Sequence, residues 1–258
     1  MITTTEAIVL RGMKFRDTSK IVSLYTRRFG RLSVIAKGAR DRKNRFGAAL
    51  EPMSFVTAVF YRKERQDLHL LSQCDLVDGF RRMTDDMDRL ATGLAVVELV
   101  SGVTHDEEAN EGLFTLLLST LTAIDRATKN PSIALYYFEV KLAHVLGFQA
   151  GFHQCLGCGR PLDERSLDAS GSSFLLDRGG CLCGSCRPGH PGGRRMTTMA
   201  LRVLQRLESL NDPDAALRIA VPADVGTELG DMLRLYLRSH VEGLRDSRAE
   251  RVFSALRY

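Results

Sequence analysis

The chain has 258 residues, of which 44% are hydrophobic and 26% charged, so it can bury a substantial core and lacks the composition of a disordered protein. Its formal net charge is +5, but residues 1–80 hold 15 Lys and Arg against 8 Asp and Glu. No apolar run approaches the ~20 residues of a membrane span, and the first residues lack a secretory pattern, so we expect a cytoplasmic protein. A basic N-terminal third indicates a polyanionic partner.

Residues 6–80 predict a small barrel of short strands. Runs rich in β-branched and aromatic residues occupy 7–10, 21–25, 32–36, 55–61 and 68–71, and polar or Gly-containing turns separate them. Short strands spaced so closely suit a closed or partly open barrel better than a sheet with crossover helices. The connection from Lys37 to Pro52 is unusually long, and long loops in compact domains are usually functional or disordered.

The periodicity becomes helical after residue 80. Apolar residues at helical spacing predict a helix around 90–100 with three aspartates near its start, and further helices at 110–128, 131–146, 198–210 and 225–244. We therefore expect an α+β fold. Its parts are a barrel in 1–80, a helical domain in 81–150 that continues in 196–258, and an insertion at 151–195 rich in Gly, Cys and Ser.

Two Cys-x-x-Cys pairs in the insertion predict a structural metal site. Cys155 and Cys158 form the first pair, Cys183 and Cys186 the second, and 24 residues separate them. Two tight loops that supply four thiolates are typical of a closed tetrahedral zinc site, which leaves no open position for catalysis. Cys181 fits the pairing less well and is interpreted as a spare thiol. Reduced thiols without a metal are the alternative.

The long loop and its neighbouring strands predict a surface that binds DNA. Lysine and arginine neutralise phosphates, and basic loops on a small barrel hold single-stranded nucleic acid in this way. A solvated face without a ligand is the alternative. The candidates are Lys37, Arg40, Arg42, Lys43 and Arg45 in the loop, and Arg11, Lys14 and Arg31 on the strands.

Two aromatic side chains in this region are candidates for stacking on bases. Phe46 lies within the basic loop and Tyr25 in the second predicted strand. Exposed rings on a nucleic-acid surface stack on successive bases. Packing in the barrel core is the alternative, and for Phe46 the sequence leaves the two open.

The sequence contains none of the common catalytic motifs. A phosphate-binding P-loop, HExxH, GxSxG and GxGxxG after a strand are all missing, which favours a binding protein over an enzyme. The chief alternative is a zinc-containing transcription regulator that grips duplex DNA with the same region. Such a regulator predicts strong sequence preference. A nuclease and a structural adaptor are weaker alternatives.

Taken in order, these features resemble the RecO family of bacterial recombination mediators. The segments that carry the resemblance are 4–10, 19–26, 30–40, 50–52 and Gly147-Phe148 leading into the first cysteine pair. The resemblance spans nearly the whole chain and implies an N-terminal OB-fold, a helical bundle and a zinc finger. It also implies binding of single- and double-stranded DNA and annealing of complementary strands. With the partner RecR, such proteins help load RecA on DNA coated by single-strand-binding protein (SSB).

The resemblance also implies roles for individual residues. Lys37 and Arg40 match basic barrel-loop positions of the family, so DNA contact is expected there first, although Asp41 dilutes the local charge. The acidic SSB tail is the other expected ligand, and it requires an apolar floor with a basic rim. Tyr136, Tyr137 and Lys141 on the third predicted helix are candidates for that site, with ordinary helix packing as the alternative.

Overall fold

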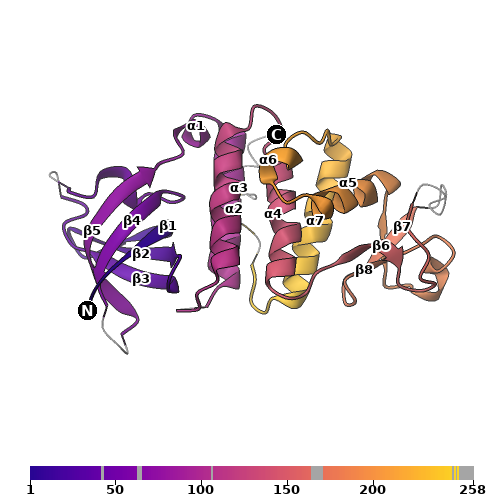
Figure 1. The fold of residues 1–258 in the computed structure, drawn as a ribbon, viewed down its shortest axis with the longest axis horizontal. Helices are drawn as coiled ribbons and strands as arrows, with labels where there is room; N and C mark the ends of the chain where they lie inside the picture. Colours follow the sequence, from indigo (N-terminus) through magenta and orange to yellow (C-terminus); the bar gives the residue numbers. More distant parts are fainter. Residues whose placement is uncertain are drawn as a thin grey trace. The chain divides into compact units, whose positions relative to one another are not determined.

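The computed structural model describes residues 1–41, 44–62, 66–105, 107–163, 171–245, 247 and 249 (Figure 1). Their contacts divide the chain into two compact units. The first comprises Met1–Ala127 with the C-terminal residues from Ser247 onward, and the second comprises Thr128–Asp246. No helix among the described residues is long and apolar enough to cross a membrane.

The N-terminal strands form a closed five-stranded barrel, which confirms the predicted architecture. Around the barrel the strands run in the order β1-β2-β3-β5-β4, with β3 and β5 parallel and the other pairs antiparallel. Inward-facing apolar side chains alternate with outward-facing ones along the strands, as closure requires. The strands are β1(Ile2–Phe15), β2(Ser19–Thr26), β3(Gly30–Ala36), β4(Phe55–Tyr61) and β5(Leu68–Asp78).

The first strand is much longer than its hydrophobic run of 7–10. Its first half pairs with β4 and its second half with β2, and a bulge between Val9 and Arg11 bends it from one partner to the other. A strand that borders two neighbours closes the barrel. The sequence concealed this length because the flanking segments are rich in threonine and in basic or small residues without regular apolar alternation.

Three helices pack with the barrel in the first unit: α1(Arg81–Thr84), α2(Met87–Val103) and α3(Glu111–Arg126). The side chain of Asp86 caps α2 by accepting from the backbone N–H of Arg89, as expected for an aspartate at a helix start. Phe114 of α3 packs against Tyr25 and Phe55 on the barrel exterior, with ring centroids 6.3 and 6.4 Å apart. The contacts therefore group the first helices with the barrel.

A tight backbone contact joins the start of β3 to the loop that follows α2. Gly30 has a φ of +66°, and a Cβ there would lie 2.0 Å from the carbonyl oxygen of Glu108. Next to it, the backbone N–H of Glu107 donates to the carbonyl of Arg31 at 2.8 Å. Only glycine permits both this conformation and this approach.

We therefore expect Gly30→Ala to reduce the free energy of unfolding by about 3 kcal/mol or more, since it combines backbone strain with a clash. Gly47→Ala is the matched control, because Gly47 has a φ of +52° but no atom within 4 Å of the added Cβ. That variant should lose only about 1 kcal/mol. Urea unfolding followed by circular dichroism measures both. Equal losses would contradict the importance of the contact.

The second unit combines helices with a small sheet. Its helices are α4(Ser132–Val145), α5(Thr198–Ser209), α6(Pro213–Ala216) and α7(Ala223–His240), and α4 packs on both α5 and α7. The sheet has the order β6-β8-β7-β9, from β6(Gly151–Cys155), β7(Ser172–Leu175), β8(Gly180–Leu182) and β9(Arg194–Met196). A 3-10 helix, η2(Arg187–Gly189), lies between β8 and β9.

Aromatic packing ties this sheet to α7. The ring of Phe174 in β7 stacks on Phe152 in β6 and meets Tyr236 of α7 edge-on at 5.2 Å. The hydroxyl of Tyr236 donates to the carbonyl of Phe148. The Gly-, Cys- and Ser-rich segment was predicted only as an insertion, and its strands are too short to leave a period-2 pattern in the sequence.

Candidate metal centre and nucleic-acid interface

The four paired cysteines gather at one end of the small sheet. Their sulfurs all lie within 4.8 Å of one another, and those of Cys158 and Cys183 are 3.8 Å apart. A tetrahedral ion with bonds of about 2.3 Å to sulfur requires edges of about 3.8 Å. Cys155 ends β6, and Cys183 directly follows β8, so the pairing of these strands brings the two Cys-x-x-Cys loops together. The set can hold a metal ion.

The backbone around the cluster is arranged for close sulfur contacts. The N–H of Cys183 donates to the sulfur of Cys155 at 3.3 Å. Burial alone would raise the pKa of Cys155, but donation from the N–H groups of Cys183, Cys158 and Gly157 lowers the pKa to about 6. A Cβ at Gly157 would lie 2.9 Å from the Cβ of Cys186, so a glycine lets the loops approach. The structure thus favours thiolate at this position.

Cys181 does not belong to the cluster of four. Its side chain is fully buried in β8, where burial, followed by the negative charge of Cys155, raises the pKa of the thiol to about 12. A thiol that resists ionisation is a poor metal ligand. This position agrees with its interpretation as a spare thiol.

On the barrel, Lys37 and Arg40 follow the end of β3 beside the β1–β2 turn. Both side chains are exposed. The guanidinium Nη1 of Arg40 donates to the carbonyls of Arg16 and Asp17 at 3.2 and 3.0 Å, and its backbone N–H donates to the carbonyl of Thr18. Arg40 therefore fixes the start of the long loop against the turn while keeping its charge at the surface.

Several other cations share this end of the barrel. We call the set formed by Arg11, Lys14, Arg16, Lys37 and Arg40 the basic surface. All five are exposed, and no carboxylate partner is found for them within the described ranges. Lys20, opposite Lys14 in the register, is instead paired with Glu51 at 3.0 Å. The basic surface thus carries positive charge that no described ion pair neutralises.

Among the remaining loop cations, only Arg45 is described. Its guanidinium lies over the ring of Phe46, 4.9 Å from the centroid, and its side chain is exposed. Arg42 and Lys43 lie outside the described residues. For Arg45, Arg42 and Lys43, contact with DNA stays a prediction.

Arg31 does not fit the predicted DNA surface. It lies in β3, where its side chain is half-buried and its Nη1 donates to the carbonyl of Ser101 in α2 at 2.8 Å. Its guanidinium links the barrel to the helix packed against it. The sequence did not distinguish this role because it did not indicate which strand faces the helix covers.

Neither predicted stacking residue presents its ring to solvent. Phe46 is 4% exposed and is part of the barrel core. Tyr25 is 0% exposed; its ring stacks on Phe114, its hydroxyl donates to the carbonyl of Asn110, and burial raises its pKa to about 12. Both rings are occupied by packing, so the stacking assignment is corrected.

The third group of candidates lies beside a pocket in the second unit. Tyr137 is buried, Tyr136 is half-buried against Gly230 of α7, and Lys141 lines the pocket. The ammonium of Lys141 donates to the carbonyl of Glu208 at 2.6 Å. Burial lowers the pKa of Lys141, although Glu208 acts in the opposite direction.

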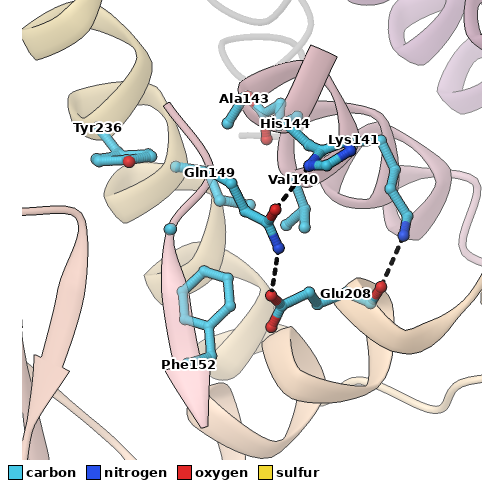
Figure 2. A pocket seen from close by; sticks show the side chains of 11 residues that line it. Val140, Lys141, Ala143, His144, Gln149, Phe152, Glu208 and Tyr236 are labelled. Atoms are coloured by element: carbon cyan, nitrogen blue, oxygen red, sulfur yellow. Dashed lines mark hydrogen bonds between the residues drawn. The ribbon is translucent and has the colours of Figure 1, made fainter. Parts of the chain in front are cut away.

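The pocket has a volume of about 180 Å³ and a mixed lining. Figure 2 shows Gln149 between His144 of α4 and Glu208 of α5, with Phe152 and Tyr236 on the other side. The amide Oε1 of Gln149 accepts from Nδ1 of His144 at 2.6 Å, and its Nε2 donates to Oε1 of Glu208 at 2.8 Å. Sequence reasoning missed Gln149 and Glu208, because they are 59 residues apart and only the packing of α4 on α5 joins them.

Comparison with known proteins agrees with this architecture. The family model described as "Recombination protein O N terminal" matches residues 1–80, and "Recombination protein O C terminal" matches residues 84–249. The DNA repair protein RecO of Prosthecochloris aestuarii is 31% identical over 100% of this chain and 98% of its own length. That of Chloroherpeton thalassium is 31% identical, with 99% of each chain covered.

A third relative gives the same result: the DNA repair protein RecO of Symbiobacterium thermophilum is 32% identical over 92% of this chain and 91% of its own. The matches run through the barrel, the helices and the cysteine-bearing sheet alike. The barrel, the four-cysteine cluster and the full-length similarity agree, and the chain belongs to the RecO family of DNA repair proteins.

Proposed function

We propose that this chain is a non-catalytic recombination mediator that binds single- and double-stranded DNA and anneals complementary strands. The observation that carries the proposal is the basic surface of the barrel, whose five exposed cations lack a carboxylate partner in the described part of the chain. Family membership supports a role in DNA repair. This function requires correctly placed positive charge and no residue that makes or breaks covalent bonds.

Electrostatics explains how such a surface promotes annealing. Two complementary strands repel each other through their phosphates, and each carries a layer of condensed counterions. Cations that neutralise phosphates release these counterions, and this entropy gain lets the protein hold both strands close together. Pairing of the bases can then begin without the protein reading their sequence.

We further propose that the four cysteines hold one structural Zn²⁺. Thiolate-rich tetrahedral sites favour this ion, and four protein ligands leave no position for water or substrate. When bound, the ion stabilises the fold and supplies no chemistry to DNA. The ion would hold the two Cys-x-x-Cys loops together and so fix the β6–β8 pairing of the second unit.

The proposed partners are RecR, the acidic tail of SSB and, indirectly, RecA. The pocket beside Lys141 supports a site for the tail, because Val140, Ala143 and Phe152 supply an apolar floor and a cation lies at its rim. Tyr137 contributes packing to α4 and no exposed contact. The half-buried carboxylate of Glu208 would oppose an acidic ligand, so the tail would have to approach along the Lys141 side.

Strand annealing with complementary oligonucleotides tests this function. We expect the protein to accelerate pairing of naked strands several-fold, with little sequence preference, and to retain acceleration on SSB-coated strands. Lys141→Ala should slow annealing only on the coated strands. Fluorescence energy transfer between labelled strands follows the reaction.

Three outcomes would oppose the proposal. Binding to one duplex sequence far above background would favour a transcription regulator. Cleavage of the oligonucleotides with Mg²⁺ or Mn²⁺ would indicate an enzyme. If Lys141→Ala slows annealing of naked and coated strands equally, the assignment of the SSB tail to this pocket is wrong, whereas the proposed annealing function still stands.

A further inference from the structure

The strand register of the barrel aligns a row of outward-facing apolar side chains. Met13 of β1 lies opposite Ile21 of β2, which lies opposite Ile35 of β3, and Ile35 lies beside Leu70 of β5. Their neighbours along each strand, such as Val22 and Val34, point into the core, so the row faces outward. We call Met13, Ile21, Ile35 and Leu70 the apolar row.

These side chains are not part of the barrel core. Met13 is 52% exposed, and Ile21, Ile35 and Leu70 are each partly exposed. Directly opposed side chains on neighbouring strands lie in contact with each other. The row is therefore a continuous apolar strip across four strands, about 14 Å long at the usual strand spacing of about 4.8 Å. Its continuity follows only from the register and cannot be read along the chain.

Exposed cations border the strip. Arg11 lies two residues before Met13 in β1, on the same face, and Lys37 follows Ile35 by two residues. In the register, Ser23 of β2 lies opposite Arg11, and Ser33 of β3 lies opposite Ser23, so two small polar side chains run parallel to the row. Small polar residues and positive charge thus border the row near Arg11, whereas exposed Leu68 of β5 lies opposite Ser33 and exposed Tyr61 of β4 lies opposite Leu70 and continues the row.

We propose that the apolar row is a platform for the unpaired bases of single-stranded DNA, with the basic surface holding the phosphates. The inference rests on the proposed function, because it assigns the base-contacting part of the same surface. Base faces are apolar and are exposed in a single strand but stacked within a duplex. The row would therefore give preference for single strands, which the cations alone cannot give.

The spacing of the row favours the same ligand. Adjacent row positions are about 4.8 Å apart, whereas successive bases in a duplex are about 3.4 Å apart. Bases that occupy successive row positions must be spaced further apart than stacked bases in a duplex, and an unpaired strand permits this wider spacing. An acidic protein segment is the other occupant that charge would accept. The stretched spacing favours the unpaired strand, and binding of an acidic peptide is measured as a separate outcome of the test.

The test compares the double variant Met13→Thr/Ile35→Thr with wild type in the full chain. Threonine keeps the preference for strand conformation while shortening the apolar contact. We expect about tenfold weaker binding of a 20-nucleotide single strand, and less than a twofold change for a hairpin duplex with the same number of phosphates. The salt dependence should be unchanged. Leu76→Thr/Val77→Thr is the matched control, since both residues are exposed and lie elsewhere in β5.

The outcomes of these binding measurements distinguish the platform from the proposed function. Equal weakening on both DNAs, or no weakening on either, overturns the inference. If Lys37→Glu leaves both affinities unchanged, the proposed function fails; if Lys37→Glu weakens both and the double variant changes neither, only the platform fails. Weakened binding of an acidic peptide with intact single-strand binding would assign the row to a protein. Should the double variant not fold, Met13→Thr alone must weaken single-strand binding about threefold.

Discussion

Replacing Cys183 by serine is expected to abolish binding of the proposed metal and to lower the melting temperature of the second unit by about 10 °C. Cys183 is buried, its sulfur lies 3.8 Å from that of Cys158, and its N–H donates to the sulfur of Cys155. The substitution removes one of four ligands and leaves the other three without a closed shell. Structural zinc contributes strongly to folding, and a loss of about 3 kcal/mol corresponds to such a shift in a unit of this size.

Cys181→Ala is the matched control for this experiment. It removes a buried thiol one residue from β8's end but none of the four clustered sulfurs. We expect this variant to keep one metal ion per chain and to lose only about 1 kcal/mol through its small cavity. Metal content by mass spectrometry and thermal melting of the same samples distinguish the two variants.

The DNA affinity of the Cys183→Ser variant separates the two units. The basic surface lies in the first unit and the cysteines in the second, so single-strand binding at low temperature should fall less than twofold. Full metal occupancy in Cys183→Ser, or a melting curve equal to wild type, would contradict a structural metal at this site. Loss of DNA binding with the barrel still folded would instead connect the cysteine cluster to the DNA surface.

The sequence predicted the parts of this molecule that depend on local pattern. The barrel strands have runs of β-branched residues, and the cysteine cluster follows from two Cys-x-x-Cys pairs whose four sulfurs meet in the folded chain. The aspartates near residue 86 were expected at a helix start, and Asp86 caps α2. Each of these features is encoded within a few neighbouring residues.

The errors concern side chains whose surroundings come from elsewhere in the chain. Tyr25 was predicted to stack on bases, but the ring of Phe114 covers it. Arg31 was predicted to contact DNA, but its guanidinium donates to the carbonyl of Ser101 in α2. Phe46 turns from the basic loop into the barrel core. A single sequence shows that such residues are aromatic or basic, but only packing decides which face is covered. The apolar row was missed for the same reason, since its members become neighbours through register.

The second large effect is expected from Lys37→Glu, which should weaken single-strand binding about tenfold at moderate salt. Lys37 is exposed, and within the described part of the chain its side chain has neither a carboxylate partner nor a hydrogen bond that the substitution would break. A lost phosphate contact makes the slope of log affinity against log salt less steep by about 0.7 for single strands, and the new carboxylate adds repulsion. The melting temperature should stay near that of wild type.

Arg40→Glu should behave differently, because the guanidinium of Arg40 also holds the β1–β2 turn through the carbonyls of Arg16 and Asp17. This variant should lose both DNA affinity and stability, whereas Lys37→Glu loses affinity alone. Lys129→Glu, an exposed cation of the second unit, is the control for an equal change in net charge. If Lys129→Glu and Lys37→Glu weaken binding equally, the effect is one of total charge and the basic surface is not the DNA site. A tenfold difference between them, with a less steep salt slope for Lys37→Glu alone, places the phosphates beside Lys37.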